Sequence, residues 1–167
     1  MKLTRVVVLF ALLFVAPPVP AQSAKSPAVD EILVLKSQHK MQLLSHGAVV
    51  HEYHVALSTV PVGAKERNGD HKVPEGEYTI DSKNPGSQFH LALHVSYPNA
   101  ADRAHAKKLG VDPGGEIEIH GLAKQYAMLG AMHRAYDWTN GCIAVTNAEI
   151  EEIYKIVPVG TKVEIRP

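Results

Sequence analysis

The chain has 167 residues, and its 17 Lys and Arg balance 17 Asp and Glu, so the formal net charge is zero. This length supports one domain with a substantial core and leaves little room for a second. Domains that bind nucleic acids carry clusters of excess basic charge, so the balanced composition argues against that class. The sequence also contains no internal repeat and no low-complexity segment.

The first 21 residues have the pattern of an export signal. Lys2 and Arg5 form a short positive start, an apolar run covers residues 6–16, and prolines and small residues follow. The run is too short for the bilayer core, which needs about 20 apolar residues. We therefore predict a signal peptide at 1–21, a polar leader at 22–28 and one domain at 29–167, exported to the periplasm or cell envelope. An uncleaved membrane anchor is the alternative for residues 1–21.

Hydrophobic patterning after the leader predicts mostly strands. Runs rich in β-branched and aromatic residues, separated by turn residues, predict strands at 32–35, 41–44, 48–57, 77–80, 89–95, 116–119, 143–145 and 162–165. The segment 58–76 is rich in Gly, Pro and charged residues, which favours a loop.

Two segments are predicted to form short helices. Residues 100–109 are small and basic and are closed by Gly110. Further on, Thr146 and Glu149 have the spacing of a capping box, with isoleucines at helical spacing after them. The segment 122–136 is mixed and is expected to be partly helical. The elements together predict an all-β or α+β domain.

The single cysteine, Cys142, is the leading candidate for a functional residue. Small exported domains usually carry paired cysteines as disulfides, and one cysteine forms no internal disulfide. A lone cysteine is often simply buried. Cys142, however, follows Thr139-Asn140-Gly141, and a glycine there allows close approach of a substrate and leaves backbone N–H groups free for an oxyanion. The sequence therefore predicts a nucleophile.

A cysteine nucleophile needs a base, and ten histidines are present. His120 is preferred because it ends a predicted strand and is followed by Gly121, which places a rigid imidazole at a sheet edge. We expect it to hold Cys142 as a thiolate in an ion pair. His133 is the second candidate, although a solvated loop position is favoured for it and for Arg134. With one cysteine and no HExxH motif, no metal and no cofactor is predicted.

These residues carry a resemblance to a known family. The segments Ile119-His120-Gly121 and Thr139-Asn140-Gly141-Cys142-Ile143 resemble the signature of L,D-transpeptidases of the YkuD type. Upstream, residues 69–78 resemble the stretch G-D-x-x-T-P-x-G-x-Y of that family, with Val73 where threonine is usual. Tyr97-Pro98-Asn99 with Asp102 resembles the central loop. The similarity covers residues 29–165.

The resemblance implies a mainly β, β-sandwich-like catalytic domain with one or two short helices packed on it. Such enzymes attack the amide after the third residue of a peptidoglycan stem peptide, form a cysteine acyl-enzyme, and pass the acyl group to an amine of another stem or of a lipoprotein. By the same resemblance, His120 is the general acid and base, and the carbonyl of Gly121 orients it. The backbone N–H of Gly141 then donates to the oxyanion.

Four further residues are candidates for substrate contact: Thr139, Asn140, Tyr97 and His133. Trp138 is expected to pack beneath the cysteine loop. The expected partners are peptidoglycan stem peptides, with an envelope lipoprotein as a further candidate, and no nucleic acid and no stable membrane span after signal cleavage is expected.

Two positions depart from the pattern of the family. Many members have histidine before the glycine and arginine two residues after the cysteine, where this chain has Asn140 and Ala144. Ala144 removes a guanidinium that can hold a carboxylate bidentately. With alanine at this position, the chain resembles one branch of the family. That branch includes an envelope hydrolase that detaches a lipoprotein from peptidoglycan. The acyl acceptor, amine or water, therefore stays open, and a wall-binding module without activity is a third possibility.

Overall fold

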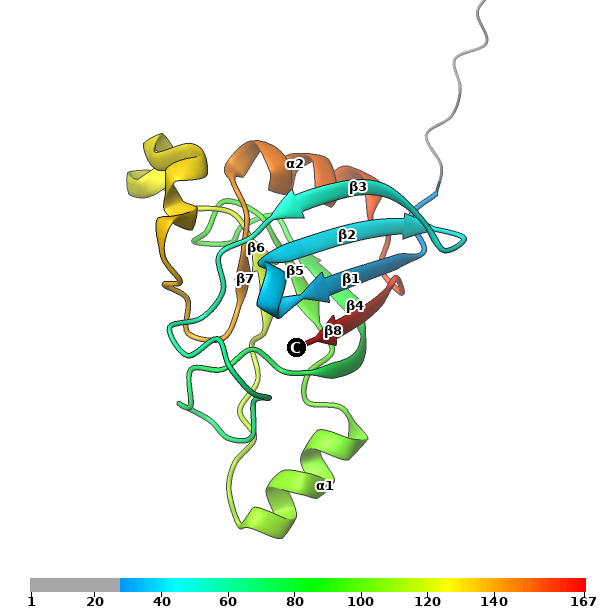
Figure 1. Ribbon diagram of the computed structural model, residues 1–167, viewed down its shortest axis with the longest axis vertical. Helices are drawn as coiled ribbons and strands as arrows, with labels where there is room; N and C mark the ends of the chain where they lie inside the picture. Colours follow the sequence, from blue (N-terminus) through cyan, green and yellow to red (C-terminus); the bar gives the residue numbers. More distant parts are fainter. Residues whose placement is uncertain (1–27) are drawn as a thin grey trace, which may run out of the picture.

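Strands dominate residues 28–167, the part of the chain that the computed structural model describes (Figure 1). The signal peptide predicted at 1–21 and almost all of the predicted leader lie outside these residues. The strands are β1 (Glu31–Leu35), β2 (Lys40–Ser45), β3 (Ala48–His54), β4 (Gly76–Asn84), β5 (Ala92–Val95), β6 (Glu118–His120), β7 (Ile143–Ala144) and β8 (Lys162–Arg166). The helical elements are α1 (Ala100–Leu109), α2 (Asn147–Ile156), a 3₁₀ segment at Lys124–Ala135 and a 3₁₀ turn at Lys36–Gln38.

The eight strands form one mixed sheet in the order β3-β2-β1-β8-β4-β5-β6-β7. The pairs β1–β8 and β6–β7 are parallel, and the other neighbours are antiparallel. Beyond β3, Ala56 forms a bridge to Ala144 of β7, so the chain leaving one edge of the sheet reaches the other edge. The predicted mainly β fold is confirmed as a single curled sheet. It carries three short helices, α1, α2 and the 3₁₀ segment, where one or two were expected.

One apolar core lies inside the curl. Residues of β1 and β2 alternate between buried and partly exposed, as period-two patterning requires. The amphipathic helix α2 adds Ile150 and Ile153, both fully buried. Complete burial of such a side chain stabilises the fold by about 1.5–3 kcal/mol relative to an exposed one. The burial of α2 therefore fixes its N-terminus against the sheet.

The helix ends follow from side-chain caps. Thr146 accepts from the N–H of Glu149 while the Glu149 carboxylate accepts from the N–H of Thr146, which confirms the predicted capping box of α2. Asn99 and Asp102 cap α1 in the same way, and Gly110 ends it in a left-handed conformation. None of the helices within residues 28–167 is long and apolar enough to span a membrane.

Two predicted strands begin later than expected, and both differences arise from left-handed residues. The strand predicted at 89–95 begins at Ala92, because His90 has φ = 78° and turns the chain between Phe89 and Leu91. The strand predicted at 116–119 begins at Glu118, because Glu116 has φ = 56°. Such conformations are uncommon for residues other than glycine and are frequent at functional sites.

The loop between β3 and β4 is ordered by a partly buried carboxylate. Asp70 accepts hydrogen bonds from the backbone N–H of Glu66 at 2.7 Å and of Arg67 at 3.0 Å, and pairs with the Lys65 ammonium at 2.9 Å. Burial alone would raise the pKa of Asp70, but the N–H donors and Lys65 outweigh it and lower the pKa to about 2. The loop then brings the backbone of Lys72 against Gly141.

We predict that Asp70→Asn lowers the free energy of unfolding by about 2 kcal/mol at pH 7, because the pKa of Asp70 falls from an ordinary 3.8 to about 2. A lowered folded-state pKa stabilises the protein above pH 3.8 and loses that contribution as the pH falls toward 2. Urea unfolding of both proteins should therefore show the same difference in the free energy of unfolding at pH 7 and pH 5. The difference should be smaller at pH 3.

Asp30→Asn is the matched control, since Asp30 is 44% exposed and accepts only from the backbone and ring of His46. Asp30→Asn should change the free energy of unfolding by less than about 0.5 kcal/mol. An Asp70→Asn effect as small as the control, or one that does not change with pH, would contradict the assignment.

Candidate active site

His120 lies at the end of β6 and is almost completely buried. The ring of Phe89 stacks on its imidazole with centroids 4.3 Å apart, and the indole of Trp138 meets it edge-on at 5.8 Å. Its Nδ1 lies 2.7 Å from the carbonyl oxygen of Gly121. A carbonyl can only accept, so Nδ1 carries the proton and Nε2 keeps the lone pair of a base.

The carbonyl of Gly121 is held in place by the first turn of α2. A Cβ at Gly121 would lie 2.6 Å from Oδ1 of Asn147 and 2.8 Å from Cγ2 of Ile150, so only glycine fits there. The same Oδ1 accepts from the N–H of Leu122 at 2.6 Å. Asn147 therefore docks the chain immediately after His120, and the orientation of the imidazole depends on α2.

Cys142 sits in a tight turn before β7. The hydroxyl of Thr139 donates to the Cys142 carbonyl at 2.7 Å and accepts from the N–H of Gly141 at 3.3 Å. Gly141 has φ = 133°, and a Cβ there would lie 3.0 Å from the carbonyl oxygen of Lys72. The N–H expected to bind an oxyanion is thus engaged with Thr139 in this structure.

The sheet register relates Cys142 to His120 through Ala144. Ala144 lies opposite His120 in the parallel pair β6–β7. Cys142 precedes Ala144 by two residues, and alternate residues of an extended chain point to the same side. This register is compatible with the predicted pairing of Cys142 with His120.

Burial keeps both groups neutral. It raises the pKa of the Cys142 thiol to about 11; the backbone N–H of Glu118 opposes this shift, and the carboxylates of Glu118 and Glu116 reinforce it. The thiol donates to the carbonyl of Glu116 at 3.5 Å. Burial also lowers the pKa of His120, although the hydrogen bond to the Gly121 carbonyl acts to raise it. Burial therefore opposes both a thiolate and an imidazolium here, since separated charges are costly in a buried site.

The other predicted substrate contacts are placed differently. Asn140 is exposed, and its Oδ1 accepts from Nδ1 of His71 at 2.9 Å. The side chain of Thr139 is buried and shapes the cysteine turn. Tyr97 is 3% exposed and its hydroxyl donates to the carbonyl of Pro113, so it packs in the core and offers little surface to a substrate.

The solvated loop position expected for His133 and Arg134 is wrong. His133 is 4% exposed, its Nδ1 accepts from the indole N–H of Trp138 at 3.4 Å, and burial, followed by the nearby Arg134 charge, lowers its pKa to about 4. Arg134 pairs with Glu149 of α2. The 3₁₀ segment turns these two side chains inward and exposes its apolar ones instead.

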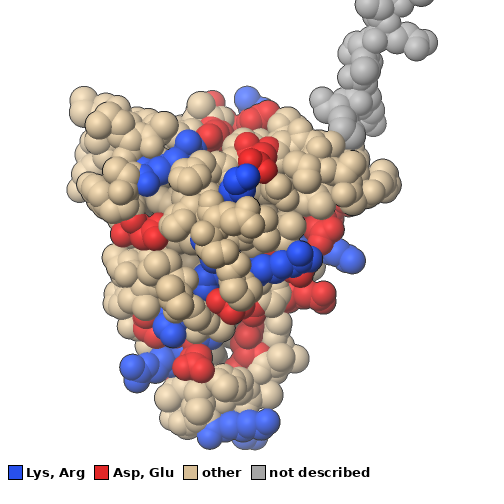
Figure 2. Space-filling view, in the orientation of Figure 1, with Lys and Arg blue, Asp and Glu red and all other residues tan. Residues whose placement is uncertain are grey.

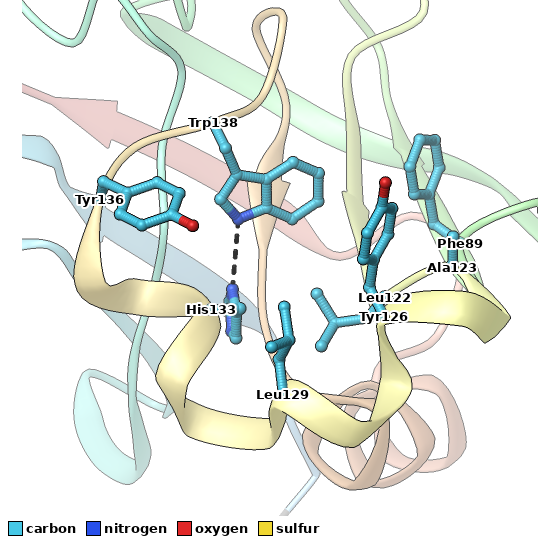
Figure 3. A pocket seen from close by; sticks show the side chains of 8 residues that line it. All are labelled: Phe89, Leu122, Ala123, Tyr126, Leu129, His133, Tyr136 and Trp138. Carbon is cyan, nitrogen blue, oxygen red and sulfur yellow. Dashed lines mark hydrogen bonds between the residues drawn. The ribbon is translucent and has the colours of Figure 1, made fainter.

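A cavity of about 320 Å³ adjoins His120 on the side of this segment (Figure 3). Phe89 and Trp138 separate it from the imidazole. Its lining residues are Phe89, Leu122, Ala123, Tyr126, Leu129, His133, Tyr136 and Trp138. Within residues 28–167, no group of three or more His, Cys, Asp or Glu side chains is placed to hold a metal ion.

Sequence reasoning missed Phe89, Asn147 and Glu116 as parts of the site. Phe89 was assigned to a strand, and Glu116 to the start of another. Asn147 follows the predicted capping threonine directly. A polar residue at the start of a helix was the sequence signal that could have pointed to it.

Comparison with known proteins agrees with this geometry. A family model described as the L,D-transpeptidase catalytic domain, YkuD, matches residues 30–165. The chain belongs to this family. Its relative YafK of Escherichia coli (strain K12), named as a provisional L,D-transpeptidase, is 31% identical over 127 residues, which are 75% of this chain and 42% of YafK.

Solved structures show the same fold. The helical cell shape determining protein Pgp2 from Campylobacter jejuni superposes with a TM-score of 0.63 at 25% identity, over 84% of this chain and 48% of Pgp2. An L,D-transpeptidase from Xylanimonas cellulosilytica DSM 15894 has a TM-score of 0.57 at 16% identity, over 90% of this chain and 65% of that one. The chain thus spans less than half the length of YafK and Pgp2.

We predict that Gly141→Ala destabilises the domain by about 1–3 kcal/mol, because the new Cβ meets the Lys72 carbonyl at 3.0 Å in a left-handed conformation. Gly47→Ala is the control, since Gly47 has φ = 80° but open space around it. Urea unfolding should show a larger loss for Gly141→Ala. Equal losses would mean that the contact with Lys72 is unimportant.

We also predict slow alkylation of Cys142 at neutral pH. A thiol pKa near 11, against an ordinary 9, leaves about 100-fold less thiolate at pH 7. The rate with iodoacetamide, followed by intact mass, should rise steadily from pH 7 toward 11 and should be unchanged at pH 7 in His120→Gln. A plateau between pH 5 and 7 that His120→Gln removes would instead reveal a resting ion pair.

Proposed function

We propose that this protein is a cysteine acyltransferase of the cell envelope that acts on peptidoglycan stem peptides as an L,D-transpeptidase. The observation that supports the proposal is the oriented base: Nδ1 of His120 donates to the Gly121 carbonyl, which leaves Nε2 free to accept a proton. Membership of the YkuD family supports the substrate class. The export signal at residues 1–21 is part of the proposal.

The neutral pair determines how the first step proceeds. Because the pKa of the thiol is raised and that of His120 is lowered, proton transfer before attack is unfavourable. The thiol proton therefore passes to Nε2 of His120 as sulfur bonds to the carbonyl carbon of the third stem residue. The imidazolium returns this proton to the leaving amine as the C–N bond breaks, and a thioester remains on Cys142.

The oxyanion of this step needs donors close to the nucleophile. The N–H of Gly141 is the proposed donor, and it must turn from the Thr139 hydroxyl toward the substrate as the oxyanion forms. The exposed amide of Asn140 lies beside it, at the rim where a stem peptide approaches.

Hydrolysis is the second candidate, with water in place of the amine. Ala144 favours it, since this position is fully buried between His120 and Ala56 and offers no cation to a second substrate. A lipoprotein bound to peptidoglycan is then a possible substrate of the same thioester chemistry. A wall-binding module without turnover is the third candidate.

Incubation with disaccharide-tetrapeptide, followed by intact mass, tests the nucleophile. We expect a thioester adduct on the wild type, none on Cys142→Ala, and acylation about 10²–10⁴-fold slower in His120→Gln. His105→Gln is the control, since His105 is an exposed residue of α1. An unchanged adduct in Cys142→Ala would overturn the assignment.

The products of the same incubation identify the acceptor. Cross-linked dimers indicate transfer, and tripeptide monomers alone indicate hydrolysis. Binding to sacculi with neither adduct nor product would overturn the enzymatic proposal in favour of a wall-binding module.

A further inference from the structure

The cavity beside His120 is aromatic and carries no formal charge. Its walls combine three aromatic side chains of the region after β6, Tyr126, Tyr136 and Trp138, with Phe89 from the turn before β5 (Figure 3). Tyr126 is 57% and Tyr136 is 72% exposed, so the rim is open to solvent. The corner of the molecule that holds the 3₁₀ segment is mostly free of charged atoms in Figure 2. A bound group is therefore expected to be uncharged and to have apolar faces.

His133 lines the cavity and brings a buried polar side chain to it. Trp138 donates its indole N–H to Nδ1 of His133, so the His133 proton is on Nε2. This Nε2 is buried and has no hydrogen-bond partner among the described residues. Burial also keeps the ring neutral, since the pKa of His133 is about 4. Buried donors are normally satisfied, so the position calls for an acceptor from a ligand.

We propose that this cavity binds an N-acetylated sugar of the glycan that carries the stem peptide. The tyrosine and tryptophan rings cover the apolar faces of the pyranose, and His133 donates to the carbonyl oxygen of its acetamido group. This inference rests on the proposed function, since it extends the substrate from the peptide to its sugar.

The chemistry of the substrate favours the sugar over the peptide. A stem peptide carries carboxylates and an ammonium group, which an uncharged aromatic cavity would desolvate without compensation. An N-acetylhexosamine within a glycan is uncharged and offers C–H faces and an amide carbonyl. The volume of about 320 Å³ lies within the range of sites for small ligands. Phe89 and Trp138 contact His120, so a sugar there lies beside the acylation site.

The intrinsic fluorescence of the protein tests binding directly, because Trp138 is its single tryptophan. We expect N,N′-diacetylchitobiose, an uncharged N-acetylated disaccharide, to change the emission in a saturable way, and cellobiose to bind at least 10-fold more weakly. The double variant Tyr126→Ala/Tyr136→Ala should weaken chitobiose binding at least 5-fold. Met128→Ala is the control, since Met128 is 90% exposed on the same segment and does not line the cavity.

Two acyl donors separate this proposal from the proposed function. We expect kcat/KM for acylation to be at least 10-fold higher with disaccharide-tetrapeptide than with free tetrapeptide, and the tyrosine variant to lose this preference while keeping its rate with free tetrapeptide. Saturable chitobiose binding without any acylation would support the sugar site and overturn the proposed function. Equal kcat/KM for both donors, no change in Trp138 emission, or equal binding of cellobiose would overturn the sugar site.

Discussion

The hydrogen bond from Nδ1 of His120 to the carbonyl of Gly121 is the constraint on which the site depends. It selects the tautomer whose Nε2 is free to accept a proton. It also requires the chain after β6 to run against the first turn of α2, where Asn147 holds Leu122 and leaves no room for a side chain at Gly121. The capping box and the buried isoleucines of α2 therefore contribute to the site as well as to stability, because a displaced helix would release the carbonyl.

Burial opposes the charged forms of both the thiol and the imidazole. Phe89 and Trp138 exclude water from the imidazole, and the left-handed Glu116 directs its carbonyl at the sulfur. The exclusion of water favours a neutral imidazole, and the carbonyl beside the sulfur favours a neutral thiol. Such a thiol is protected from adventitious oxidation, since the thiolate is the reactive form. In the proposed reaction, the charge needed for attack forms only when a substrate carbonyl is present to receive the sulfur.

Local patterns in the sequence were sufficient for most of the fold. Alternation predicted the strands, and Thr146 with Glu149 predicted the start of α2, because these signals act over a few neighbouring residues. The motif around Cys142 and His120 predicted a nucleophile and a base, and the register places Ala144, two residues after Cys142, opposite His120. The left-handed His90 and Glu116 were not predictable, since contacts distant in sequence impose their conformation. For the same reason the burial of His133 was missed, as it depends on Trp138 and on the path of a 3₁₀ segment.

The bridge between Ala56 and Ala144 also limits how a peptide can approach. Ala144 exchanges both of its backbone hydrogen bonds with Ala56, at 2.9 and 3.0 Å, while its other side pairs with β6. The strand that follows the cysteine consequently has no open edge, so a stem peptide cannot extend the sheet as an added strand, a common way for proteins to bind extended chains. Under the proposed function, the scissile amide would instead reach the sulfur from the end of the strand, through the turn at Asn140. Selectivity for a peptide at this site therefore depends on side chains and loop amides rather than on main-chain pairing.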